Sequence, residues 1–159
     1  MNLEPINIAN YDMRKKEEEA NFLDDGLIKI TCEFNERKYC INQSSICFIT
    51  KEIFQLLDID RYELSVMITN ANKIQELNLQ YRDKNKTTDV LSFPQIEWEY
   101  PCAVGVLSKE SSSLKIPQNT LGDLVISLEQ TEHNAQNIGQ SINREFCFLL
   151  VHGILHLCG

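Results

Sequence analysis

The sequence predicts one α+β domain, similar to an α/β arrangement, in which helices back a mixed sheet of about four strands. Segments that alternate apolar and polar residues, as half-buried strands do, are interspersed with segments whose apolar residues recur every three to four positions, as in amphipathic helices. The 159 residues are enough for one hydrophobic core, and no internal repeat or linker divides them. We expect a buried central helix over residues 146–157, where nearly every residue except two histidines is apolar.

The composition limits the possible function classes. A formal charge of −8 and a pI near 4.9 argue against a protein that covers nucleic acid by bulk electrostatic attraction, so any contact with nucleic acid needs a local basic patch. No apolar run reaches the roughly 20 residues that span a bilayer, so no membrane association is expected. The six cysteines show no close pair of the metal-binding type, and no signal peptide precedes them, which predicts free thiols in a reducing cytoplasm.

The chain begins with a segment of mixed charge. Residues 1–26 show little periodicity, and the Arg-Lys-Lys-Glu-Glu-Glu run at 14–19 is typical of a solvated helix or tail. We therefore predict an exposed charged arm over residues 1–26 and the folded domain over 27–159. The first strand of that domain has alternate residues on its buried face, namely Ile28, Ile30, Cys32 and Phe34.

Two helices and a strand come next. Ser44 or Ser45 can cap the first helix, which should end near Asp58, and Asn70 or Asn72 can open the second. The apolar stripe of the first helix consists of Ile46, Ile49, Ile53 and Leu56. The strand between the helices has Tyr62, Leu64, Val66 and Ile68 on its inner face. The second helix should turn Ile74, Leu77 and Tyr81 inward and deliver Arg82 at its exit.

The remaining strands flank a long irregular segment. Residues 87–94 are β-branched and apolar enough for a third strand, which Pro94 ends. Residues 95–119 predict a surface excursion with a short strand near 103–107, and residues 121–127 form the fourth strand.

Local capping signals then mark the last two helices. Ser127 and Gln130 fit a capping box for a helix that closes at Gly139. Ser141 or Asn143 starts the terminal helix.

The terminal helix carries the strongest chemical signal. His152 and His156 are four residues apart, so both imidazoles lie on one helix face, where they could bind zinc. The alternative is a pair of core histidines that bond to the backbone, but unpaired rings on so apolar a helix would be costly, which favours the ligand interpretation. Gly153 stands where a zinc protease has its glutamate base, so peptide hydrolysis is disfavoured, and the glycine indicates either close packing or room beside a metal.

Three segments together resemble a known family. The terminal His-Gly-Ile-Leu-His-Leu-Cys-Gly, preceded by residues 88–94 and then 121–127, is similar to the YbeY family of bacterial rRNA maturation factors, from about Leu27 to the final residue. The resemblance implies a single-strand-specific, metal-dependent endoribonuclease in small-subunit rRNA maturation and ribosome quality control. It implies one Zn²⁺ per chain, and as partners single-stranded RNA, rRNA and the ribosomal small subunit or its proteins.

The resemblance also implies a ligand set. Three histidines in the pattern His-x-x-x-His-x-x-x-x-x-His would hold the zinc, and His152 and His156 match the first two. The third would lie beyond Gly159, so we expect that the chain is truncated at this end, that another group completes the site, or that metal binds poorly. Within the chain, Cys158 should point to the opposite helix face, and His133 is a weak candidate.

Four cations and one carboxylate complete the candidate site. Arg82, in Leu-Gln-Tyr-Arg, matches the arginine that the resemblance places near the metal and on the RNA, and a planar guanidinium can bind a phosphate and stabilise developing charge. Its alternative is a surface arginine paired with Asp83 or Glu76. Asp123 could accept a hydrogen bond from a ligand histidine or satisfy a local turn. The other candidates for RNA contact are Lys84, Lys86 and Arg144.

Two functions are favoured over a third, a metallohydrolase of another substrate such as a peptide, which the missing glutamate disfavours. One is phosphodiester hydrolysis with zinc on the histidines and Arg82 on the phosphate, for which no separate general base is visible. The other is a non-catalytic ribosome-assembly or RNA-binding factor with a structural metal.

Overall fold

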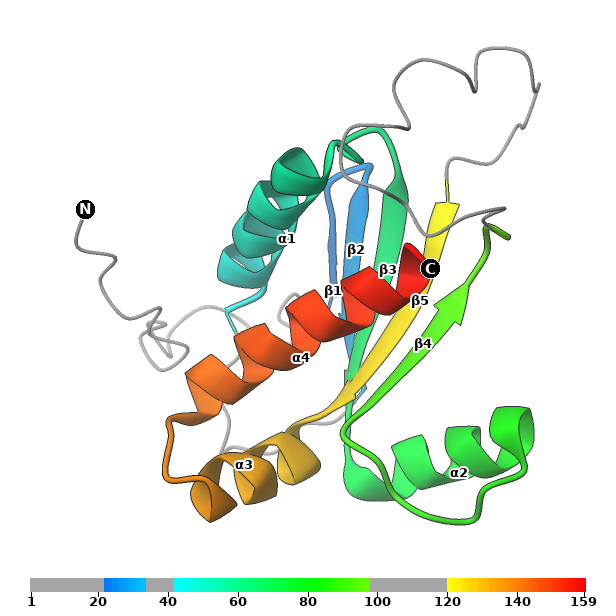
Figure 1. Ribbon diagram of the computed structural model, residues 1–159, viewed down its shortest axis with the longest axis vertical. Helices are drawn as coiled ribbons and strands as arrows, with labels where there is room; N and C mark the ends of the chain where they lie inside the picture. Colours follow the sequence, from blue (N-terminus) through cyan, green and yellow to red (C-terminus); the bar gives the residue numbers. More distant parts are fainter. Residues whose placement is uncertain (1–21, 34–41, 98–119) are drawn as a thin grey trace.

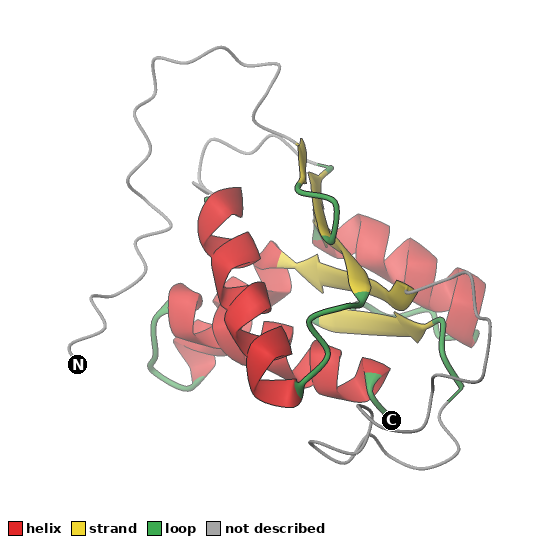
Figure 2. Cartoon of the chain, turned by 90° about the horizontal axis from the view of Figure 1, so that it is seen from above, coloured by secondary structure: helices red, strands yellow, loops and turns green. Residues whose placement is uncertain are grey.

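The computed structural model describes residues 22–33, 42–97 and 120–159, which form a five-stranded sheet with four helices (Figure 1). Seen from above, helices lie on both sides of the sheet (Figure 2). The elements in chain order are β1 (Phe22–Asp24), β2 (Ile28–Cys32), α1 (Gln43–Leu57), β3 (Glu63–Thr69), α2 (Ala71–Arg82), β4 (Val90–Pro94), β5 (Thr120–Ser127), α3 (Leu128–Asn137) and α4 (Ile142–Leu157).

The sheet is mixed, as predicted, and has the strand order β1-β2-β3-β5-β4. The three central strands run parallel, while β1 and β4 pair antiparallel at the two edges. The additional strand is β1, which lies inside the segment predicted as an arm and pairs Phe22 with Thr31. At three residues it is too short to show a periodicity in the sequence. Phe34 and the predicted strand near 103–107 lie outside the described residues.

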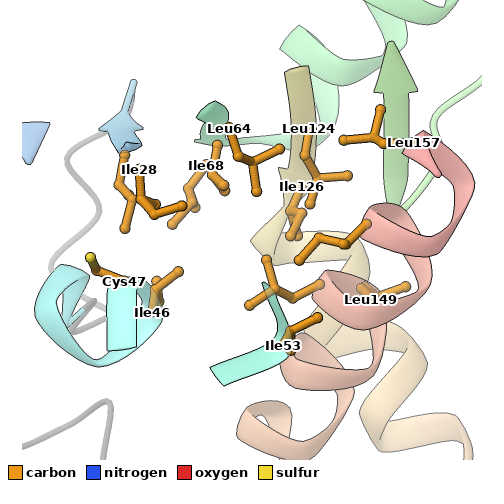
Figure 3. Close-up of a cluster of buried hydrophobic side chains, with 14 of the residues drawn as sticks. Ile28, Ile46, Cys47, Ile53, Leu64, Ile68, Leu124, Ile126, Leu149 and Leu157 are labelled. Carbon is orange, nitrogen blue, oxygen red and sulfur yellow. The ribbon is translucent and has the colours of Figure 1, made fainter. Parts of the chain in front are cut away.

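The two faces of the sheet are covered by different helices. α1 and α4 pack on one face, where Leu124 and Ile126 of β5 point toward them (Figure 3). α2 covers the other face, where Ile74 contacts Leu91 and Val125. Because successive residues of a strand point to opposite faces, β5 is buried on both sides.

Helix starts follow the local capping signals with one exception. Asn70, Ser127 and Ser141 each accept a hydrogen bond from the backbone of their own first turn, as predicted. The prediction of Ser44 or Ser45 for α1 is wrong, because Asn42 is the cap and accepts from the Ser45 amide at 3.0 Å.

Two residues predicted to face the core are exposed. Leu56 is 77% exposed, because it lies roughly a third of a turn away from the buried stripe of α1, in which Phe54 takes its place. Tyr81 is 60% exposed, because the last turn of α2 lies beside the edge strand β4, where the Tyr81 ring meets only the edge of Phe93 at 5.2 Å between centroids.

Helix α4 lies very close to β5. A Cβ on residue 153 would stand 2.2 Å from Leu124 Cδ1, and a Cβ on residue 122 would stand 2.3 Å from the Phe93 carbonyl oxygen and 2.9 Å from Leu157 Cδ2. Gly153 therefore allows the close packing of α4 on Leu124, which is one of the two reasons that the sequence left open. Among the helices of the described segments, none has the length and apolar character that crossing a membrane requires.

Asp25 ties the turn between β1 and β2 to α1. Its carboxylate accepts the Ile28 amide at 2.8 Å and the Cys47 thiol at 3.1 Å, and it forms an ion pair with Lys51. Burial alone would raise the pKa of Asp25, but Lys51 and the hydrogen bonds outweigh it and hold that pKa well below its usual range. Burial, together with Asp25, raises the pKa of the Cys47 thiol to about 11, so this thiol stays protonated at neutral pH.

The close approach of α4 gives a first prediction. Gly153→Ala should lower the free energy of unfolding by about 1–3 kcal/mol, because the new methyl group overlaps Leu124, although alanine is the better helix former. Urea unfolding at equilibrium measures the change. In a Leu124→Ala background the same substitution should cost little, since its obstacle is gone. An equal loss in both backgrounds would show that the packing contact is not the cause.

The Asp25 contacts give a second prediction. The pKa of Asp25 is lower in the folded chain than in the unfolded chain, so its contribution to stability is fully present above pH 4 or so and is lost as the pH falls toward the folded value. Asp25→Asn should therefore be less stable than wild type at pH 7, and the gap in melting temperature should shrink below about pH 4. Asp60→Asn, on an exposed residue, is the control. A gap that is independent of pH would contradict this account.

Candidate functional site

The two histidines lie on the exposed face of α4. The buried face of this helix carries Leu150, Gly153, Ile154 and Leu157, whereas His152 and His156 are both exposed. The expected burial of the histidines is thus wrong. Apolar residues occur all around α4, but the helix is buried on one side only. The two imidazoles are therefore in contact with solvent and do not need a bonding partner within the protein.

The imidazoles nevertheless converge. The Nε2 atoms of His152 and His156 are 3.1 Å apart, and the ring centroids are 4.5 Å apart at an interplanar angle of 87°. Two nitrogen ligands at roughly 2.0–2.1 Å from a tetrahedral zinc stand about 3.3 Å apart, so the pair has nearly the separation that one ion requires. Among the described residues, neither ring bonds to a backbone group as a core histidine would; the hydrogen-bond contact is between the two rings themselves.

Within the described segments, no third ligand joins the pair. No group of three or more histidine, cysteine, aspartate or glutamate side chains there is arranged to hold a metal ion. His133 is on α3, where its Nδ1 contacts the amides of Gln130 and Asn137. Cys158 is 5% exposed in the core, so the prediction that it points away from the histidines is confirmed. The pair fits a zinc ion as two of its four ligands.

Arg82 is the last residue of α2, as predicted, and is held against β4. Its Nη2 donates to the Ser92 carbonyl oxygen at 3.0 Å, and its guanidinium carbon lies 6.0 Å from the centre of the Phe93 ring. Glu76 pairs instead with Lys73, and the Asp83 backbone caps α2. The side chain is therefore oriented by uncharged groups, and most of its five N–H donors are not used by this contact.

Ser92 connects Arg82 with the histidine helix. While its carbonyl oxygen accepts from Arg82, its hydroxyl donates to the Gly153 carbonyl oxygen at 3.2 Å, directly after His152. β4 thus links α2 on one face of the sheet to α4 on the other. In the sequence, the one local sign of this role is that Ser92 is a polar residue between Leu91 and Phe93 in an apolar strand.

The other cations do not form one patch. Lys84 and Lys86 are exposed in the loop after Arg82, and that loop is fixed by the Asn78 side-chain amide, which donates to the Lys86 carbonyl oxygen at 2.8 Å. Arg144 is exposed in the first turn of α4, eight residues or about 12 Å along the helix from His152. The structure thus groups the two lysines with Arg82 and leaves Arg144 apart.

Asp123 is not brought to the histidines. It pairs across the strands with Phe93, which packs on the α2 face, and accepts from Gln95 Nε2 at 3.4 Å. The neighbouring Leu124 is the residue that faces α4. Strand alternation therefore places Asp123 on the face opposite the histidine helix, where it cannot orient their rings.

The sequence of this chain is similar to a family of known proteins. A family model described as "Endoribonuclease YbeY" matches residues 30–159, which include Arg82 and both histidines. The chain belongs to the YbeY family. A protein of Caldicellulosiruptor saccharolyticus named "Endoribonuclease YbeY" is 38% identical over 136 residues, covering 83% of each chain. One of Syntrophomonas wolfei with the same name is 46% identical over 99 residues, which is 61% of this chain and 58% of that protein.

A solved structure is similar in fold. The solution structure of TM1509 from Thermotoga maritima superposes with a TM-score of 0.51 at 21% sequence identity, covering 84% of this chain and 73% of the other. At this identity the similarity shows that this chain and TM1509 share a fold, and it carries no argument about activity.

Proposed function

We propose that this chain is a metal-dependent endoribonuclease that cleaves single-stranded RNA in small-subunit rRNA maturation and serves ribosome quality control in the cytoplasm. The observation that carries the proposal is the convergence of the His152 and His156 Nε2 atoms, 3.1 Å apart on an exposed helix face. It is supported by the family, whose relatives are named endoribonucleases. The substrate is rRNA in or near the small subunit, whose proteins are the expected partners.

The histidines would hold one Zn²⁺ through their neutral Nε2 atoms. When bound, zinc would polarise a phosphoryl oxygen and lower the pKa of a water toward about 7. Structural zinc sites are closed by four protein ligands, whereas these histidines are exposed. This exposure favours a site that admits substrate over the alternative of a non-catalytic assembly factor with a structural metal.

Arg82 would neutralise the phosphate. Its guanidinium is held by the Ser92 carbonyl oxygen and the Phe93 ring, so a planar pair of N–H groups can be offered to phosphate oxygens with little loss of side-chain freedom. Because the whole chain is acidic, attraction to RNA must be local, and Lys84 and Lys86 lie directly beyond Arg82. Arg144 would contact RNA farther from the cleaved bond.

Substitutions in the site give a third prediction. His152→Ala and Arg82→Ala should each reduce cleavage of single-stranded RNA by about 10²-fold or more, with unfolding curves close to wild type, because both side chains are exposed. His133→Ala is the control for the histidine. Arg61→Ala is the control for the arginine, because Arg61 lies over the Tyr62 ring at 5.4 Å much as Arg82 lies near Phe93. Undiminished cleavage in either test variant would remove that residue from the mechanism.

Metal content gives a fourth prediction. Elemental analysis of protein equilibrated with zinc should find one zinc per wild-type chain at saturation, and less in His152→Ala and His156→Ala but not in His133→Ala. Removal of the metal with a chelator should abolish cleavage, and zinc should restore it. Zinc retained by both site variants would place the metal elsewhere, and full cleavage without metal would refute metal dependence.

A further inference from the structure

An exposed apolar strip surrounds the histidine pair. Phe148, Val151 and Leu155 are 59%, 38% and 48% exposed, and their spacing along α4 places them on the same side of the helix as His152 and His156. Large apolar side chains gathered on one surface are a common mark of a binding site. Here the strip is continuous with the proposed metal site.

Within the strip, Phe148 is the residue whose ring contacts a histidine of the proposed metal site. Its ring lies nearly parallel to that of His152, at 15° with 5.8 Å between centroids, and the His152 ring is edge-on to His156. Phe48 on α1 is equally exposed, at 65%, so exposure alone does not distinguish Phe148. Phe148 differs in that its ring lies nearly parallel to the imidazole of His152, one helical turn away, and His152 in turn contacts His156.

We propose that Phe148 is a substrate-positioning residue on which a nucleobase of single-stranded RNA stacks, beside the nucleotide whose phosphate meets the histidine pair. This inference rests on the proposed function. Aromatic side chains bind the faces of unstacked bases, whereas bases inside a duplex offer no free face. Such stacking would select single strands without reading sequence.

The charge of the chain supports this assignment. At −8, the protein gains little from general attraction to phosphates, so contacts that need no charge carry a larger share of binding. Stacking on an aromatic ring is such a contact. Val151 and Leu155 would add an apolar surface along the same face of α4, while Arg82 and the two lysines hold the backbone.

Cleavage of abasic substrates tests the inference. A single-stranded RNA is prepared as a set in which one nucleotide at a time lacks its base, and kcat/KM is measured for wild type, Phe148→Leu and the matched control Phe48→Leu. Wild type and Phe48→Leu should lose about tenfold at one position next to the cleaved bond. Phe148→Leu should be about tenfold slower on the intact RNA and insensitive to the missing base at that position, and Phe148→Trp should restore both properties.

The results separate the inference from the proposed function. If wild type cleaves and Phe148→Leu keeps the same kcat/KM and the same abasic profile, the stacking role is overturned. The proposed nuclease activity is then unaffected. If wild type does not cleave, a binding measurement decides. Trp98→Phe first removes the single tryptophan of the sequence, and Phe148→Trp or Phe48→Trp is then added as a fluorescent probe. The oligonucleotide should quench the fluorescence of Phe148→Trp and should not quench that of Phe48→Trp. Quenching without cleavage supports stacking and refutes the nuclease, and absence of both refutes both. A strip that binds a protein instead would leave every RNA readout unchanged.

Discussion

Helix α4 and strand β5 lie very close together, and a glycine stands at two of the places where they approach each other. Gly153 leaves space for the Leu124 side chain, and Gly122 leaves space for the Phe93 carbonyl oxygen and the end of Leu157. This close approach allows one face of α4 to bury its leucines and isoleucine against the sheet. The packing of this inner face fixes the position of α4 relative to β5. The outer face of α4, which carries the two histidines, is positioned by the same contact.

The same approach brings the edge strand β4 into the site. Its Ser92 hydroxyl donates to the Gly153 carbonyl oxygen at 3.2 Å, at the point where α4 lies close to β5. On its other side the Ser92 carbonyl oxygen orients Arg82. The outer side of an edge strand normally has backbone groups without hydrogen-bond partners, which other chains can pair with. Here the Arg82 guanidinium donates to one of these groups, the Ser92 carbonyl oxygen. The arginine is thereby tied to the histidine helix through a single residue of the strand.

Local signals in the sequence predicted the elements well and their burial less well. The caps Asn70, Ser127 and Ser141 follow from contacts within four residues, and the strands Ile28–Cys32 and Glu63–Thr69 follow from their alternation. The exposure of His152 could not be read in this way, because apolar residues occur on every side of α4 and periodicity then does not identify the buried face. The orientation of Asp123 depends on which face of β5 packs against α4, and that is set by tertiary structure.

The division of α4 into two faces separates stability from chemistry. Its inner face packs on the sheet through Gly153 and its neighbours, so a change there acts first on the free energy of unfolding. Its outer face offers exposed imidazoles that contact each other and the Phe148 ring, and these contribute little to the core. A metal that served as a structural clip would need ligands from elements that it holds together, but both histidines come from one helix whose fold is already fixed by the sheet. Loss of the proposed metal should therefore leave the fold intact, which is the expectation for the proposed chemical role and not for a structural one.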